Sequence, residues 1–385
     1  MKAVELFTGA GGLGIGVSRA GFEAAVVVER DRYCCDTIRE NKERGLEPLV
    51  GWPLVQGDVR DVNYHEICDE IDLVSGGPPC QPFSLGGKHK GFLDKRDMFP
   101  EAIRAVRELK PRAFLLENVK GLTRPAFANY FEYMRLQLTY PDLMGKSGEA
   151  WVDHLVRLER HHTDGRGVNP TYLVVTRILN AADYGVPQRR ERIFIVGFRS
   201  DLGIEWSFPI PTHSREALLW AQWRSGDYWE SMKVKKPNGD TALRAQHSAR
   251  RLREPPDTKP WQTVRQALAD LPDPEYEPRM ASRHLNHGFQ AGARSYPGHT
   301  GSPHDEPAKT LKAGDHGVPG GENMLRRMDG SLRYFSIRES ARLQTFPDDY
   351  VFHGTWTESM RQLGNAVPVD LAEVVARSIR DHLEP

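Results

Sequence analysis

An apolar strand pattern, a glycine-rich turn and the start of a helix follow one another in Val4-Glu5-Leu6-Phe7-Thr8-Gly9-Ala10-Gly11-Gly12-Leu13-Gly14. Glycines at such a turn let the backbone approach a ligand closely, and they leave helix N–H groups free for an anionic group. The signal is weak by itself, because ordinary tight turns also need glycine. It predicts the first β-α unit of an open sheet, with a ligand site at the carboxyl end of the strand.

The alternation of strands and helices continues to about residue 200. Further strand patterns cover residues 24–28, 54–56, 71–74, 113–116 and 193–197, and a helix pattern covers 99–109. This rhythm predicts an α/β fold with a mostly parallel, Rossmann-like doubly wound sheet.

The rhythm fails near Ser200. Residues 201–333 are rich in Pro, Gly, Trp, His and Arg, and predict a smaller, loop-rich domain inserted into the first. Helix patterns return at Ser336–Leu343 and Val369–Leu383, so three parts are expected: 1–200, 201–333 and 334–385, the last returning to the first domain. Within residues 136–170, Trp151–Arg160 predicts an amphipathic helix without an evident task.

Composition excludes several classes of protein. Charged residues make up 27% of the 385 residues and hydrophobic ones 39%, as in soluble globular proteins. No apolar run has membrane-spanning length, and the chain enters a strand pattern at once, so neither a membrane partner nor a signal or transit peptide is expected. The four cysteines lack metal-type spacing, which favours reduced thiols in a cytosol-like compartment and no bound metal.

The formal net charge is zero, with 52 basic and 52 acidic residues, which taken alone argues mildly against nucleic-acid binding. The window Lys233 to Arg265, however, holds nine basic and three acidic residues. It suits either a solvated surface or contacts with phosphates.

Two carboxylates accompany the glycine turn. Glu29 ends the second strand pattern, seventeen residues after Gly12 and near the ~20 expected for a ribose-binding acid. Asp58 ends the next strand-like segment. These features permit either NAD or S-adenosylmethionine, although the turn lacks the Gly-x-Gly-x-x-Gly order typical of dehydrogenases.

A cysteine stands in a second unusual turn, Gly76-Gly77-Pro78-Pro79-Cys80-Gln81-Pro82-Phe83-Ser84. The prolines cannot continue a strand or enter a helix interior, so a stiff turn holds the thiol at the carboxyl end of a buried strand. A free cysteine is usually a small core residue. So many prolines and polar neighbours make a poor core segment, and a nucleophile is favoured.

The segment Pro-Pro-Cys-Gln-Pro-Phe-Ser resembles the catalytic motif of the DNA cytosine-5 methyltransferases. Other segments are similar to motifs of that family and follow its order. They are Phe7–Gly12, Glu117–Val119, Gln188–Arg192, Asp305–Leu311, Arg338–Pro347 and Gly364–Pro368. The resemblance covers nearly the whole chain, apart from residues 136–170 and most of 201–300, and implies a methyltransferase fold.

The resemblance implies S-adenosylmethionine as cofactor. Phe7 would contact the adenine, the glycine turn would surround the methionine part, Glu29 would take the ribose hydroxyls and Asp58 the adenine amino group. The full expected cofactor set is Phe7, Gly9, Ala10, Gly11, Gly12, Leu13, Glu29, Asp58, Gly77, Pro79, Asn365 and Val367.

The chemistry of carbon-5 methylation needs a nucleophile, because that carbon is unreactive until a thiolate adds at carbon 6. Cys80 takes this role. Glu117 would hold a proton at ring nitrogen 3. The resemblance implies that Arg192 would bind oxygen 2, with Arg190 nearby to order Glu117 and phosphate. Apart from the motifs, Glu117 and the arginines could equally form a structural ion-pair network.

Duplex DNA is the expected substrate, with the target cytosine rotated out of the stack. Residues 86–91 (Gly-Gly-Lys-His-Lys-Gly) are expected to form a mobile loop that closes over DNA, and 201–333 a target-recognition domain. We expect a bacterial, cytosolic monomer. It would either be paired with a cognate restriction endonuclease or be solitary. A transfer-RNA methyltransferase and an inactive DNA-binding relative are the alternatives.

Overall fold

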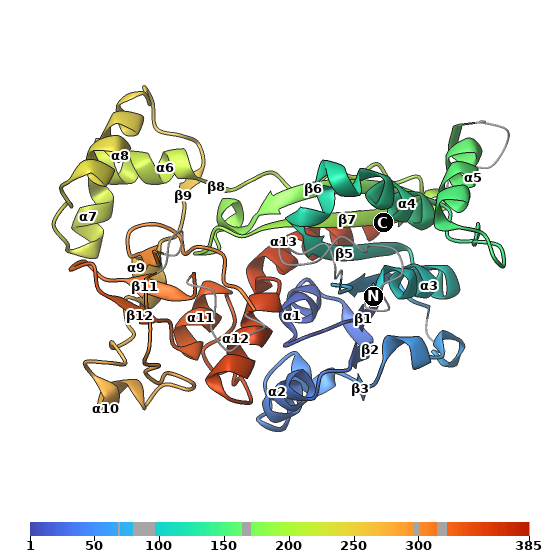
Figure 1. The fold of residues 1–385 in the computed structure, drawn as a ribbon, viewed down its shortest axis with the longest axis horizontal. Helices are drawn as coiled ribbons and strands as arrows, with labels where there is room; N and C mark the ends of the chain where they lie inside the picture. The colour runs from blue at the N-terminus through green and yellow to red at the C-terminus, as the bar shows by residue number, and fades with distance from the viewer. Residues whose placement is uncertain (68–69, 80–96, 164–170, 296–299, 314–321, 385) are drawn as a thin grey trace. The chain divides into compact units, whose positions relative to one another are not determined.

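The computed structural model describes residues 1–67, 70–79, 97–163, 171–295, 300–313 and 322–384 (Figure 1). The chain divides into two compact units. The first contains residues 1–179, 191–208 and 372–385, and the second contains 180–190 and 209–371.

A seven-stranded sheet in the order β3-β2-β1-β4-β5-β7-β6 forms the centre of the first unit. The strands are β1 Lys2–Leu6, β2 Glu23–Glu29, β3 Leu54–Gln56, β4 Leu73–Gly76, β5 Ala113–Val119, β6 Tyr172–Asn180 and β7 Glu191–Arg199. Strands β1 to β5 pair in parallel and β7 runs antiparallel to β5. The predicted mostly parallel, doubly wound sheet is confirmed.

Among the described residues, the α-helices that accompany this sheet are α1 Gly12–Arg19, α2 Arg32–Glu43, α3 Phe99–Leu109, α4 Ala128–Thr139, α5 Trp151–Thr163 and α13 Val369–Leu383. Side chains of α3 and α4 join alternate sheet residues such as Val4, Leu6 and Phe114 in one buried apolar cluster. Glu5 points the other way, towards Gly14 of α1. Helices therefore cover both faces of the sheet, and the carboxyl ends of the central strands stay available for ligands.

The second unit holds the remaining elements. Its helices are α6 Arg215–Leu219, α7 Asp227–Met232, α8 Asp240–Arg250, α9 Val264–Leu268, α10 Pro278–Ala281, α11 Ile337–Leu343 and α12 Trp356–Asn365. Its strands are β8 His213–Ser214, β9 Lys259–Pro260, β10 Ser302–Pro303, β11 Met324–Arg326 and β12 Leu332–Tyr334. Residues 201–333 thus contain more helix than the sequence pattern indicated. Several of these helices are too short to show a clear period, and Leu218, Tyr228 and Trp229 form an apolar core among them.

The domain bounds 1–200, 201–333 and 334–385 remain a prediction beside these compact units. Residues 334–371 belong to the second unit, and the last segment of the first unit begins at Ala372. Within the second unit, Gln344 bonds to Gln188 and to the carbonyl oxygen of Leu363. In the described part of the chain, no helix is both long and apolar enough to cross a membrane.

Candidate active site

The glycine turn and Glu29 form one hydrogen-bonded unit. Adjacent strands β1 and β2 end beside each other, and the Gly9 N–H donates to Glu29 Oε2 at 2.7 Å. The N–H groups of Arg30 and Asp31 donate to Glu29 Oε1 at 2.8 and 2.6 Å. Gly9 has φ +58°, and a Cβ placed on it would meet no atom within 4 Å, so open space lies beside the Gly9 Cα.

Two opposed effects act on the pKa of the Glu29 carboxyl. Burial raises the pKa of this carboxyl above its usual value, because a charge is costly away from water. The three backbone N–H groups oppose that shift by stabilising the ionised form. The arrangement holds a carboxylate ready to accept hydrogen bonds at the end of β2.

The other predicted cofactor residues of the turn are arranged around a tight bend. Phe7 has φ +55° and Gly11, the residue before α1, has φ +88°. Ala10, Gly11, Gly12 and Leu13 are buried, whereas Phe7 and Gly9 are partly exposed. Phe7 and Gly9 are therefore the residues of the turn that a ligand can reach, and residues 10–13 lie in the interior behind them.

Asp58 follows β3, which pairs with β2, and its carboxylate is bound by arginines. Arg60 donates from its backbone N–H and Nε to Oδ1 at 3.0 and 2.9 Å, and from Nη2 to Oδ2 at 2.6 Å. Arg30 donates from Nη1 to Oδ2 at 3.1 Å. These contacts hold the pKa of Asp58 well below its usual range, with the Arg60 side chain as the main cause.

Cys80, the predicted nucleophile, lies outside the described residues, as does the 86–91 segment. The backbone before Cys80 is described and is well anchored. Asn118 Nδ2 donates to the Pro78 carbonyl oxygen at 2.8 Å, and the Met98 N–H donates to that of Pro79 at 3.2 Å. The folded chain thus uses Asn118 to fix the segment that leads to the cysteine.

Glu117 and Arg192 form an ion pair at the ends of β5 and β7. The antiparallel register pairs Val119 with Arg192, which brings Arg192 Nε within 3.0 Å of Glu117 Oε1. Their side chains are only 9% and 13% exposed. Burial lowers the pKa of Arg192, and the neighbouring Glu117 opposes that shift.

Gly77 joins this pair to the cysteine segment. A Cβ on Gly77 would lie 3.4 Å from Glu117 Oε2, so the backbone three residues before Cys80 runs directly beside the carboxylate. Pro79 is exposed at the end of the described segment. Glu117, Arg192 and the approach to Cys80 are thus brought together within one unit.

Arg190 is completely buried and bonds to main-chain carbonyls. It donates from Nη1 to the Leu311 carbonyl oxygen at 3.0 Å and from Nη2 to that of Gly364 at 2.8 Å. These contacts join two backbone segments of the second unit. The expected role of Arg190 in ordering Glu117 and phosphate stays a prediction.

The predicted cofactor residues Asn365 and Val367 lie in a turn that the Gln344 side chain supports. Gln344 Nε2 donates to the carbonyl oxygens of Leu363 and Ala366 at 2.5 and 3.3 Å. Asn365 is exposed and Val367 is buried. The role of Gln344 was missed, although it stands inside the Arg338–Pro347 motif that could have indicated it.

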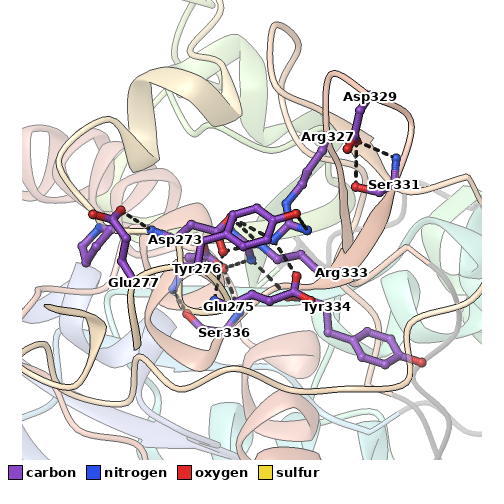
Figure 2. A network of polar contacts seen from close by, with 12 residues as sticks. Asp273, Glu275, Tyr276, Glu277, Arg327, Asp329, Ser331, Arg333, Tyr334 and Ser336 are labelled. Carbon is purple, nitrogen blue, oxygen red and sulfur yellow. Dashed lines mark hydrogen bonds and ion pairs between the residues drawn. The ribbon is translucent and has the colours of Figure 1, made fainter. Parts of the chain in front are cut away.

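Arginines of the second unit fall into two groups. Arg327 and Arg333 are bound to Asp273, Arg327 also to Glu275, and Arg333 also to the buried Glu339 (Figure 2). Within the basic window, Arg265 donates two bonds to Asp305 at 2.6 and 3.0 Å. Others are exposed, among them Arg244, Arg250, Arg251 and Arg253 on and after α8.

Comparisons with known proteins agree on one family. The family model described as "C-5 cytosine-specific DNA methylase" matches residues 1–140 and 167–381. The chain is 31% identical to Type II methyltransferase M.PspPI of Psychrobacter over 98% of this chain and 78% of that protein. It is 33% identical to Type II methyltransferase M.FnuDI of Fusobacterium nucleatum over 100% and 95%.

The fold agrees with that result. The crystal structure of S. pombe Dnmt2 methyltransferase superposes with a TM-score of 0.57 at 16% identity, covering 100% of this chain and 98% of that one. Residues 141–166, which include α5, lie outside the family match, as the sequence motifs indicated for 136–170. The chain therefore belongs to the C-5 cytosine-specific DNA methylase family and is a DNA cytosine-5-methyltransferase.

Proposed function

We propose that this enzyme transfers a methyl group from S-adenosylmethionine to carbon 5 of a cytosine in a specific duplex DNA sequence. The cytosine would be rotated out of the helix and joined transiently to Cys80. The observation that carries this proposal is the buried Glu117–Arg192 ion pair beside Gly77, three residues before the cysteine.

The residues of the first unit fit an adenosyl cofactor. Gly9 opens onto free space, Glu29 offers a fixed carboxylate for two ribose hydroxyls, and Phe7 and Asp58 flank the same strand ends. Gly9 to Leu13, Gly77 and Pro79 would surround the methionine part. We include Asn365 and Val367 on the resemblance alone. The cofactor supplies an electrophilic methyl group on sulfur.

Each protein group then has one task on the cytosine. The Cys80 thiolate forms a bond to carbon 6, which makes carbon 5 nucleophilic. Glu117 holds a proton at nitrogen 3, where electron density builds up, and Arg192 donates to oxygen 2. After carbon 5 is methylated, loss of its proton and of the Cys80 sulfur restores the aromatic ring. Arg190 is assigned here to supporting the 311 and 364 segments.

Sequence selection is proposed for residues 201–333, with exposed arginines near α8 contacting DNA. Two relatives are named Type II methyltransferases, which supports a modification enzyme that protects DNA from a cognate restriction endonuclease. We propose that it acts as a monomer in the bacterial cytosol.

Bisulfite sequencing of DNA from cells that express the wild type tests this function. Methylcytosine should occur at one recurrent sequence and be absent with Cys80→Ser, because serine is not ionised at neutral pH. Duplex DNA with 5-fluorocytosine should trap the wild type covalently, since fluorine replaces the proton that must leave. Full methylation by Cys80→Ser would reject the nucleophile, and methylation of RNA alone would reject the substrate.

A further inference from the structure

The carboxylate of Asp58 is saturated with hydrogen bonds. Oδ1 accepts from the Arg60 N–H and Nε, and Oδ2 accepts from Arg60 Nη2 and Arg30 Nη1. A carboxylate offers about four acceptor positions, two on each oxygen. No position therefore remains for the amino group of an adenine, which is the ligand assigned to Asp58 above.

The two arginines hold Asp58 very differently. Arg60 binds with its backbone N–H and with Nε and Nη2 of its guanidinium, and Asp58 also caps the short helical turn Val59–Asp61 that contains Arg60. Arg30 makes a single bond of 3.1 Å from a side chain that is 73% exposed. A ligand competing for Asp58 would displace Arg30 far more readily than Arg60.

The position of Arg30 couples it to the cofactor site. It follows Glu29 directly, and its N–H donates to Glu29 Oε1 at 2.8 Å. A ribose that bonds to Glu29 therefore arrives beside the residue whose side chain occupies Asp58. The adenine amino group would find its acceptor only after this guanidinium has left.

We propose that adenosine binding displaces Arg30 from Asp58 and that Arg60 remains as the positioning residue that fixes the carboxylate. Arg30 then competes with the cofactor for Asp58, and Arg60 holds the Asp58 carboxylate in place. The inference rests on the proposed adenine-binding role of Asp58.

Calorimetry on the full chain tests this with two ligands. One is S-adenosylhomocysteine, and the other is its analogue with hydrogen in place of the adenine amino group. The variants are Arg30→Gln, Arg60→Gln and Asp58→Asn. Arg39→Gln is the control, because Arg39 is a partly exposed arginine nearby that bonds to Asp36 and Gln56 instead.

Arg30→Gln should bind S-adenosylhomocysteine more tightly, by no more than about fivefold because exposed ion pairs contribute little. It should bind the analogue as the wild type does. Arg60→Gln should weaken S-adenosylhomocysteine binding and reduce the preference for it over the analogue. Arg30→Gln should have no effect in an Asp58→Asn background, and Arg39→Gln should behave as wild type.

Weaker binding of S-adenosylhomocysteine by Arg30→Gln, or equal tightening for both ligands, would overturn the displacement while leaving Asp58 in the site. If Asp58→Asn binds both ligands like the wild type, the adenine role of Asp58 is wrong and the displacement with it. Methylation with unchanged sequence choice in that variant would show that the enzyme's function stands independently.

Discussion

Arg192 Nε lies 3.0 Å from Glu117 Oε1, although 75 positions separate the two residues in the sequence. The antiparallel pairing of β5 with β7 makes this contact possible, because it brings the start of β7 beside the end of β5. The two groups therefore keep a fixed spacing, which their proposed roles at nitrogen 3 and oxygen 2 of a cytosine require.

Glu117→Gln should lower kcat by about 10²–10⁴-fold, because the amide cannot hold and return a proton. Arg192→Lys should lower kcat by about 10²–10³-fold, since a point charge replaces a planar donor aimed at oxygen 2. Steady-state kinetics measures kcat of both variants, and single-turnover methylation measures the rate of the chemical step. Trapping by 5-fluorocytosine DNA should slow in parallel, because both groups assist the addition step.

Glu191→Gln provides a matched control for this pair. Glu191 is adjacent to Arg192 on β7 and pairs with Lys120 at 2.9 Å, but both side chains are more than half exposed. Its loss should leave the single-turnover rate within about twofold of wild type, as for a surface ion pair of small energy. A loss of rate equal to that of Glu117→Gln would argue for a general disturbance of β7 instead of a local chemical role.

Glu29→Ala should weaken S-adenosylmethionine binding by ~1.5–3 kcal/mol and DNA binding much less, because a charged hydrogen-bond acceptor is removed from one site only. Calorimetry measures the first and a gel-shift titration the second. Asp36→Asn is the control, since Asp36 lies on α2 and pairs with Arg32 and Arg39 at the surface. Unchanged cofactor affinity in Glu29→Ala would remove Glu29 from the site.

Glu5 should make stability depend on pH. It is buried in β1 beside Ser75, and burial raises the pKa of its carboxyl to about 8. In the unfolded chain this group ionises near pH 4.5, so the folded state binds the proton more tightly. Its contribution to stability is fully present below about pH 4.5, falls as pH rises through about 8, and is constant above that.

Glu5→Gln should therefore flatten the decline in unfolding free energy between about pH 5 and pH 8, by on the order of a few kcal/mol. Urea titrations across this range measure it. Glu23→Gln, at the exposed end of β2, is the comparison, because Lys2 lowers the pKa of that carboxyl instead of raising it. A decline in Glu5→Gln as steep as in wild type would show that Glu5 is not the responsible group.

The sequence predicted the sheet well because its evidence is local. Runs such as Ala113–Leu116 are apolar without interruption, and Phe99–Leu109 has a clear helical period, so each element could be recognised by itself. The edge strand Tyr172–Asn180 was missed, since an edge strand alternates buried and exposed residues less regularly.

The candidate site was predicted as a set of motifs, but the contacts within it could not be. Nothing local distinguishes Arg190 from Arg192, two residues apart in the same motif, yet one bonds to main-chain carbonyls and the other to Glu117. Likewise, Arg30 is an ordinary surface residue in the sequence, and only the pairing of β2 with β3 brings it onto Asp58. Such partners depend on tertiary geometry that composition and spacing do not encode.

The basic window Lys233 to Arg265 should contain arginines of two kinds, and the structure separates them. Arg250 and Arg251 are exposed at the end of α8, whereas Arg265 is held by Asp305 and packs beside Tyr228, which bonds to the same carboxylate. The double variant Arg250→Ala/Arg251→Ala should bind target and non-target DNA more weakly by similar factors. Its plot of log affinity against log salt should become shallower by about one unit for each phosphate that the variant no longer neutralises. Its unfolding midpoint in urea should match the wild type.

Arg265→Ala should show the opposite pattern, because it leaves Asp305 without its ion-pair partner. Its unfolding midpoint should fall, and its salt slope should equal that of the wild type. A double variant with the wild-type salt slope would show that α8 does not contact the phosphate backbone. Loss of preference for the target sequence, at equal salt slope, would instead mean that these two arginines read bases.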